Sequence, residues 1–348
     1  MVLLSSVHHD DSHPPDEILS LPILLIFPHS RCDCRCIMCD IWRDRRVQEI
    51  SADEIRHLLT EMEKLAVRRV VFSGGEPLLH SNLFALCELL KSRNVQTTLL
   101  STGRRLKECA RQVVQWVDDV ILSLDGPAPV HDRIRRVRGA YGQMVEAIHE
   151  IRRHNPLFPI ACRSTVQRNN FRYLRDTLKA ARLAGFDSIS FLAVDLVSSA
   201  FNRADGWGPE RQSQISLSND EISELESEIE SLIGDHADEI RSGFLKESPA
   251  KLRRIVDHFR AHLGLVDPVA PRCNAPWVSA VIEADGTVRP CFFHGSLGNV
   301  REASLTAILN APSSLRFRQD LDVSQNPVCQ RCVCSLYWED ESGSQPAD

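Results

Sequence analysis

Cysteine is the residue type whose spacing is most informative in this sequence. The chain has 12 cysteines in 348 residues, with four of them inside residues 32–39 and three inside 329–334. Disulfide frameworks are typical of small secreted chains, and this chain is neither small nor preceded by a segment that resembles a signal peptide. Clustered thiols therefore indicate metal binding.

The first cluster has the spacing of an iron–sulfur site with one open position. Cys32, Cys36 and Cys39 form a C-x3-C-x2-C pattern directly after an apolar run. Three thiolates on one loop can bind three irons of a four-iron cubane, and the fourth iron is then left to bind a ligand. A zinc site needs four ligands and usually draws them from two separated pairs. Cys34 is not needed for this spacing, and we expect its side chain to point away from the cluster.

A second set of four cysteines lies near the end of the chain. Cys273 and Cys291 flank a predicted hairpin with a tight turn at Asp285-Gly286, and Cys329 and Cys332 form a C-x2-C knuckle. The two halves can converge on one centre. Four thiolates fill either a tetrahedral zinc site or all four corners of a cubane, and the residues alone leave both open.

The elements around the first cluster predict a parallel sheet. Six apolar runs alternate with segments of helical periodicity, and Ser51 with Glu54 forms a capping box at the first of these. Six such units are too few for a full eightfold barrel, which typically needs ~250 residues. We expect an α/β fold, a partial (β/α)6 TIM-like barrel, with its chemistry at the carboxyl ends of the strands. The runs are residues 21–27, 69–72, 96–100, 119–124, 159–166 and 188–194.

The three-cysteine loop after the first strand resembles that of the radical S-adenosylmethionine (SAM) superfamily. Further segments agree: Ser73-Gly-Gly-Glu-Pro77, Ser101-Thr-Gly103, Ser123-Leu-Asp-Gly126 and His131-Asp132 follow the second, third and fourth strands. The resemblance implies a [4Fe-4S] cluster on Cys32, Cys36 and Cys39, with SAM bound at its open iron. The residues that it places around SAM are Met38, Ser73, Gly74, Gly75, Glu76, Pro77, Ser101, Thr102, Ser123 and Asp125.

The resemblance also implies the reaction type. In this superfamily the reduced cluster cleaves SAM, and the resulting 5′-deoxyadenosyl radical abstracts a hydrogen atom from the substrate. The protein supplies positioning and a dry cavity. A reductant such as flavodoxin or ferredoxin is the implied protein partner.

The second set, Cys273, Cys291, Cys329 and Cys332, is similar in order and spacing to the twitch form of the SPASM extension, which implies one auxiliary [4Fe-4S] cluster. The fold class then includes a small C-terminal twitch-type β-hairpin/helix auxiliary-cluster domain. The spacing resembles that of 2-deoxy-scyllo-inosamine dehydrogenase, and this favours net oxidation of a small molecule with the auxiliary cluster as electron acceptor. Formation of crosslinks in a peptide is the alternative, and a non-catalytic electron-transfer or metal-sensing protein, with iron–sulfur or zinc, is the alternative from another class.

Substrate oxidation needs a proton acceptor, and several residues at predicted strand ends offer one. Arg163 lies on the fifth strand, Asp132 follows the fourth and Asp195 ends the sixth. We expect these three to be the catalytic residues, although ordinary hydrogen-bonded roles compete for each. The arginine run from Arg133 to Arg138 is expected to be a solvated face.

Composition limits the partners and outlines the domains. The net charge of −6 argues against nucleic acid, and no apolar run approaches the ~18–20 residues that cross a membrane. We expect a cytoplasmic protein. The expected division is an N-terminal extension (1–20), a radical SAM partial barrel (21–200), a linker with helices (201–268), an auxiliary-cluster domain (269–340) and a disordered tail (341–348).

Overall fold

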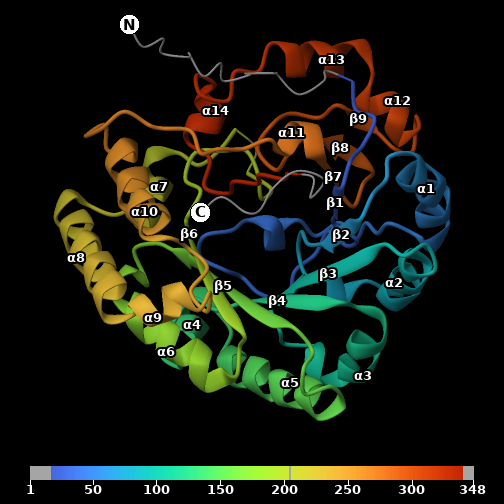
Figure 1. Ribbon diagram of the computed structural model, residues 1–348. Helices are drawn as coiled ribbons and strands as arrows, with labels where there is room; N and C mark the ends of the chain where they lie inside the picture. Colours follow the sequence, from blue (N-terminus) through green and yellow to red (C-terminus); the bar gives the residue numbers. More distant parts are fainter. Residues whose placement is uncertain (1–16, 204, 340–348) are drawn as a thin grey trace, which may run out of the picture.

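The computed structural model describes residues 17–203 and 205–339. The expected disordered tail lies outside the described residues, as does most of the expected N-terminal extension. Within the described ranges, one nine-stranded sheet has the order β6-β5-β4-β3-β2-β1-β7-β8-β9. Helices cover one face of its first six strands, and the sheet curves so that its other face is concave (Figure 1). The predicted α/β class with a mostly parallel sheet is confirmed.

The first six strands are parallel and alternate with helices, as the sequence predicts. The strands are β1 (Ile23–Ile26), β2 (Arg69–Phe72), β3 (Gln96–Ser101), β4 (Asp119–Ser123), β5 (Ile160–Val166) and β6 (Ser188–Ala193). The helices between them are α1 (Ala52–Lys64), α2 (Leu83–Lys91), α3 (Leu106–Trp116), α4 (Ala128–Arg135), α5 (Ala140–His154) and α6 (Leu174–Ala184), with short 3-10 turns at Ile41–Arg43, Pro77–Leu79 and Phe171–Tyr173.

Local sequence explains where these helices begin and end. Ser51 accepts a hydrogen bond from the Glu54 amide, and the Glu54 side chain accepts one from the Ser51 amide, so the predicted capping box is present at α1. Gly185 ends α6 with φ +85°, a left-handed conformation that glycine adopts without strain. The predicted capping box is thereby confirmed.

Burial alternates along β5 and shows which face is open. Ile160, Cys162 and Ser164 are buried against the helices, whereas Arg163 and Thr165 are only half-buried and lie on the concave face. A parallel sheet with both faces covered would bury both sets of side chains. The concave face of the sheet is therefore the accessible interior of the fold.

The C-terminal part extends the same sheet. The predicted hairpin is present as β7 (Ser279–Ile282) and β8 (Thr287–Arg289), followed by β9 (Gly298–Asn299). β7 pairs in parallel with β1 in a four-residue register from Ile23–Ser279 to Ile26–Ile282. The remaining helices are α7 (Pro209–Ile215), α8 (Asn219–Asp235), α9 (Ala237–Arg241), α10 (Pro249–His262), α11 (Ala275–Val278), α12 (Leu305–Leu309), α13 (Pro312–Gln319) and α14 (Pro327–Gln330).

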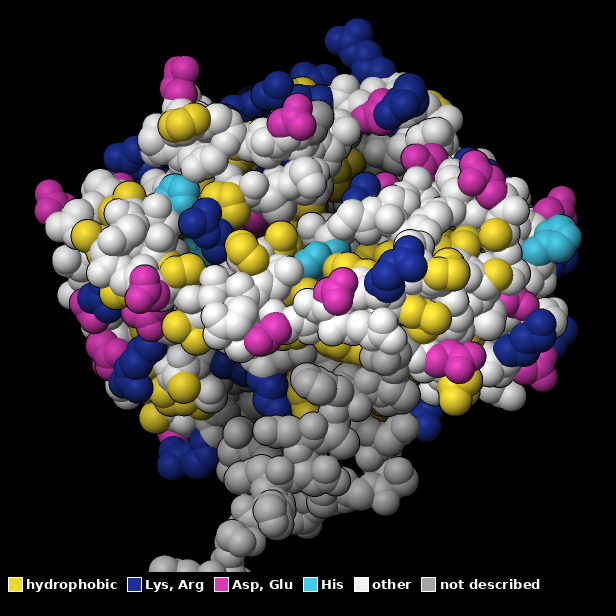
Figure 2. Space-filling view, turned by 90° about the horizontal axis from the view of Figure 1, so that it is seen from above, with side chains coloured by type: hydrophobic (Ala, Val, Ile, Leu, Met, Phe, Trp, Pro, Cys, Tyr) yellow, Lys and Arg dark blue, Asp and Glu magenta, His cyan; other side chains and the backbone are white. Residues whose placement is uncertain are grey.

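Two surface observations bear on possible partners. Among the described residues, no helix is both long and apolar enough to cross a membrane. Figure 2 shows acidic and basic side chains interspersed over one face of the molecule, without a continuous basic patch on that face.

Candidate active site

The first cysteine loop leaves the carboxyl end of β1 and is fixed along its length by backbone contacts. The amides of Arg35 and Ile37 donate to the carbonyl oxygens of Arg135 (3.2 Å) and Ile134 (3.1 Å) at the end of α4. The Trp42 indole donates to the Cys39 carbonyl oxygen at 2.8 Å. The loop is thus held at the top of the barrel, where the sequence predicts the chemistry.

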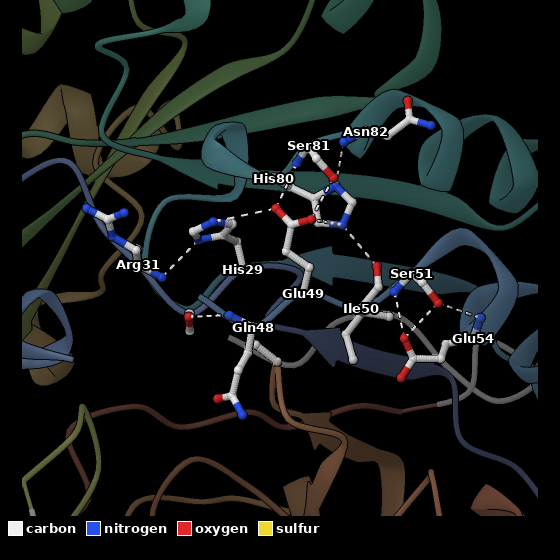
Figure 3. Close-up of polar contacts among 12 residues, drawn as sticks. His29, Arg31, Gln48, Glu49, Ile50, Ser51, Glu54, His80, Ser81 and Asn82 are labelled. Atoms are coloured by element: carbon white, nitrogen blue, oxygen red, sulfur yellow. Dashed lines mark hydrogen bonds and ion pairs between the residues drawn. The ribbon is translucent and has the colours of Figure 1, made fainter. Parts of the chain in front are cut away.

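A polar network fixes the start of this loop (Figure 3). His29 accepts a hydrogen bond on Nδ1 from the Arg31 amide at 2.9 Å, which leaves its Nε2 toward Glu49 at 3.5 Å. Glu49 also accepts hydrogen bonds from the Ser81 amide (2.8 Å) and hydroxyl (2.6 Å), while His80 contacts the Ile50 carbonyl oxygen. Burial lowers the pKa of His29, so this histidine is a neutral donor near pH 7. The network joins the loop to the segments before α1 and α2.

The predicted glycine-rich segment after β2 lies against the cysteine loop. The Glu76 amide donates to the Arg31 carbonyl oxygen at 2.9 Å. A Cβ at Gly75 would lie 2.1 Å from that same oxygen, so only glycine allows this approach. The segment therefore positions the residue before Cys32.

Glu76 connects this segment to the end of β3. Its buried carboxylate accepts hydrogen bonds from the Ser101 hydroxyl (2.9 Å) and from the Thr102 amide (2.7 Å). Burial and the charge of Asp33 raise the pKa of Glu76 to about 7. The structure thus brings the predicted segments after β2 and β3 together beside the loop.

The Cys36 thiol lies beside a buried arginine. Arg135 donates from Nη1 to the Cys36 sulfur at 3.5 Å, and its Nη2 lies 2.7 Å from an Asp125 carboxylate oxygen. Cys34 is buried and shares a side-chain hydrogen bond with Cys36. The bond from Cys34, together with the Arg135 charge, lowers the pKa of Cys36 to about 7 despite burial. The expectation that Cys34 points away is wrong, because its side chain faces its neighbour two residues on.

Two of the three expected catalytic residues are engaged in contacts that stabilise the fold. Asp132 accepts hydrogen bonds from the amides of Gly139 (2.5 Å) and Tyr141 (2.9 Å) at the start of α5. Asp195 forms a buried ion pair with Arg203 at 2.7 Å, and Arg203 donates to the Met38 carbonyl oxygen at 2.8 Å. Asp195 therefore supports the cysteine loop through Arg203.

The second cysteine set converges, and it includes a fifth thiol. Asn274 binds residues 336–338 through its amide and its side chain, which brings the final segment beside Cys273. Burial raises the pKa of the Cys329 thiol to about 12, with a further rise from the neighbouring Cys291 and Cys273. Cys332 is affected in the same way by Cys334, Cys273 and Cys291. The four predicted thiols, with Cys334, therefore lie within electrostatic reach of one another.

A cavity of about 650 Å³ lies between β5 and β6, α10 and the second cysteine set. Its walls include Arg163 and Ser190 from the concave face, Glu247 and Lys251 near the start of α10, and Cys332 and Cys334 from the second set. Arg163 is thus the one expected catalytic residue that lines it. Arg163 Nε donates to the Ser190 hydroxyl at 3.2 Å, and Glu247 accepts a hydrogen bond from the Phe191 amide at 2.9 Å.

The donor sets fit iron–sulfur clusters with SAM. In the described part of the chain, no three His, Cys, Asp or Glu side chains surround a single-ion position. A cubane needs one thiolate per iron, so its sulfurs need not share an ion. Gln167, the residue after β5, is fully buried, and neither atom of its side-chain amide has a partner among the described residues. A polar ligand such as SAM at this end of the barrel would satisfy that amide.

Three residues of this region are missing from the sequence-based prediction. Glu247 follows no motif, and Cys334 is surplus to the four-cysteine spacing. Arg135 belongs to a run predicted to be solvated, yet its exposed fraction is 8%. The one available signal is helical phase, because Arg135 lies four residues after His131, which is also buried.

Comparisons with known proteins agree with this site. Residues 26–181 match the model of the radical SAM superfamily, and residues 273–333 match that of SPASM, an iron-sulfur cluster-binding domain. The chain is 25% identical to the AdoMet-dependent heme synthase of Methanosarcina barkeri, over 44% of this chain and 45% of that protein, so it spans less than half the length of this relative. It is 23% identical to the Fe-coproporphyrin III synthase of the same organism, over 89% of this chain and 80% of that one.

Solved structures share the fold. SuiB of Streptococcus suis bound to S-adenosylmethionine has a TM-score of 0.63 at 13% identity, over 92% of this chain and 74% of that chain. The first family implies a [4Fe-4S] cluster and SAM, and the second implies auxiliary iron–sulfur clusters. The superfamily predicted from the cysteine loop is thereby confirmed: this chain carries a radical SAM domain followed by a SPASM iron-sulfur cluster-binding domain.

Proposed function

We propose that this enzyme removes a hydrogen atom from a small polar molecule and completes a two-electron oxidation, so that an alcohol carbon becomes a carbonyl. The observation that carries the proposal is the cavity that α10 encloses together with β5, β6 and the second cysteine set. Residues of β5 and β6 form one part of its wall, α10 and its flanking residues form a second, and residues 330–335, with Cys332 and Cys334, form a third. A substrate in this cavity lies beside the auxiliary cysteines, where an electron acceptor is needed.

Two bound groups supply the redox chemistry. Cys32, Cys36 and Cys39 would hold the cluster that binds SAM, which would supply the radical for hydrogen abstraction, and Cys273, Cys291, Cys329 and Cys332 would hold one auxiliary [4Fe-4S] cluster, which would supply a one-electron acceptor. A flavodoxin or ferredoxin is the proposed source of electrons for the first cluster.

The residues of the cavity supply binding and proton transfer. Glu247 is half-buried, and burial raises its pKa above the ordinary value of a glutamate. A carboxylate with such a pKa is suited to accept the proton that leaves a substrate hydroxyl. Arg163 lines the same cavity, and its charge lies within electrostatic reach of Glu247, so its guanidinium can bind a substrate oxygen beside that carboxylate. Of the three expected catalytic residues, Arg163 is therefore the one that we retain.

SAM cleavage tests the first half of the proposal. The protein is reconstituted with iron and sulfide under anaerobic conditions, then given dithionite and SAM, and 5′-deoxyadenosine is measured. Replacing Cys32, Cys36 or Cys39 by Ala should abolish this product. Failure of the wild-type protein, with about eight irons per chain bound, would refute a catalytic role and favour the electron-transfer or sensing alternative.

Substrate turnover tests the second half. Deuterated amino alcohols and cyclitols are screened for transfer of deuterium into 5′-deoxyadenosine and for a product lighter by two hydrogens. Glu247→Gln and Cys329→Ala should retain SAM cleavage while losing product formation, because each lacks a group needed after hydrogen abstraction. Full turnover by both variants would contradict the assigned roles.

A second candidate is crosslinking within a peptide. The chain is 23% identical to a PqqA peptide cyclase of Granulibacter bethesdensis over 87% of this chain and 77% of that protein. Crosslinking is also a two-electron oxidation and can use the same clusters. Deuterium transfer from a peptide, and none from the small molecules, would favour this candidate.

A further inference from the structure

Arg135 and Asp125 form a buried ion pair whose positive end faces a cluster cysteine. Asp125 is fully buried after β4, and Arg135, at the end of α4, is 8% exposed. The guanidinium lies between the carboxylate, at 2.7 Å, and the Cys36 sulfur, at 3.5 Å. The resemblance to radical SAM proteins places Asp125 around SAM, whereas here its carboxylate is turned to Arg135 and to the Thr165 amide.

The pair is held rigidly, so its direction relative to Cys36 is fixed. The backbone of Arg135 accepts a hydrogen bond from the Arg35 amide, one residue before Cys36. The Asp125 amide donates to His131 Nδ1 at 3.2 Å, and its carboxylate accepts from the Thr165 amide at 3.2 Å. Both charges are therefore tied by backbone to the elements that carry them.

From this geometry we propose that the Arg135–Asp125 pair sets the reduction potential of the SAM-binding cluster, with Arg135 raising it and Asp125 limiting the rise. Reduction adds negative charge to the cluster, and a cation that donates a hydrogen bond to a ligand sulfur favours the reduced state. The carboxylate behind it opposes that effect. Screening by water is weak because both groups are buried. The proposal rests on the first cluster and not on the identity of the substrate.

Opposite variants test it. Arg135→Gln should lower the midpoint potential, because it removes the cation and leaves Asp125 uncompensated. Asp125→Asn should raise it, because Arg135 then acts alone. Arg135→Lys keeps the charge and should stay closer to the wild type. Each of the first two changes is expected to shift the ratio of oxidised to reduced cluster at least tenfold at a fixed applied potential, which corresponds to 59 mV for one electron.

The measurement is a redox titration followed by electron paramagnetic resonance, made on samples with matched iron content. The second cysteine set is replaced by alanine so that one cluster gives the signal. Arg138→Gln is the matched control: it removes the same charge from an exposed position of the same arginine run and should leave the potential unchanged.

Shifts of opposite sign support the proposal, because a merely structural pair would destabilise the fold in both variants without opposite effects on potential. Equal potentials, or shifts of the same sign, would overturn it. If Arg135→Gln binds too little iron to titrate, the other two variants decide the matter. The midpoint potential should then rise in Asp125→Asn and stay close to the wild-type value in Arg135→Lys. Loss of all SAM cleavage with normal potentials would instead count against the proposed function.

Discussion

A single methyl group at Gly75 should disturb the first cluster site. In Gly75→Ala, the new Cβ would lie 2.1 Å from the Arg31 carbonyl oxygen and 2.6 Å from its carbon. Non-bonded heavy atoms pack best at about 3.5 Å, so the backbone before Cys32 must move by roughly 1 Å or more. The overpacking costs about 1–3 kcal/mol. The hydrogen bond from the Glu76 amide to Arg31 adds about 1 kcal/mol if it breaks.

Two measurements follow from this displacement. Urea unfolding of the metal-free protein should show the free energy of unfolding lowered by about 2–4 kcal/mol. Reconstitution should load less iron, because Cys32 follows the displaced residue. Gly142→Ala is the matched control: it lies inside α5, a Cβ there meets nothing within 4 Å, and the change should stabilise the protein by up to about 1 kcal/mol.

Equal stability and equal iron content in the Gly75→Ala and Gly142→Ala variants would refute the reasoning. It would mean that the loop moves freely by an ångström. A lower free energy of unfolding with normal iron content would show that the segment after β2 moves in place of Arg31, so that Cys32 keeps its position.

Three further predictions concern groups elsewhere in the fold. Burial lowers the pKa of His131 to about 3 and of His258 to about 4. Both histidines are therefore neutral in the folded protein near pH 7. The free energy of unfolding should be highest above pH 6.5 and fall toward pH 4 by about 1.4 kcal/mol per pH unit for each histidine, because the unfolded chain then binds the protons. Urea titrations across this range measure the slope, and a flat profile would contradict the assignment. Asp195→Asn breaks the buried ion pair with Arg203 and should lower the free energy of unfolding by about 3–5 kcal/mol, as measured by thermal unfolding. A decrease below about 1 kcal/mol would show that this pair is not needed to hold the cysteine loop. Ser51→Ala removes the cap of α1 and should cost about 1 kcal/mol, whereas an unchanged melting curve would mean that water replaces the cap.

The sequence predicts the repeating part of the fold well because local periodicity determines it. The strand Arg69–Phe72 has the same bounds in the structure as in the prediction, and the predicted capping box begins α1. Both features depend on a few adjacent residues, a short run rich in valine in one case and a serine three residues before a glutamate in the other. The hairpin at Asp285-Gly286 is equally local.

Long-range placement is what the sequence does not predict. The hairpin indicates nothing about its parallel pairing with β1, because more than 250 residues separate the partners. Arg135 and its exposed neighbours Arg133 and Arg138 have the same chemistry, and the packing of α4 against the cysteine loop is what buries Arg135. Glu247 gains its importance from the segment that covers the β6 edge.

The pairing of β7 with β1 has a consequence for anyone who dissects this protein. Truncation at residue 268 would remove β7, the hydrogen-bonding partner on one side of β1. β1 would become an exposed edge strand, and such strands tend to pair with another copy of the chain. The SPASM domain therefore also covers β1, which would otherwise be an edge strand of the radical SAM domain. The two domains share one continuous sheet. A version of the radical SAM domain made alone would need another strand paired with β1 to stay soluble.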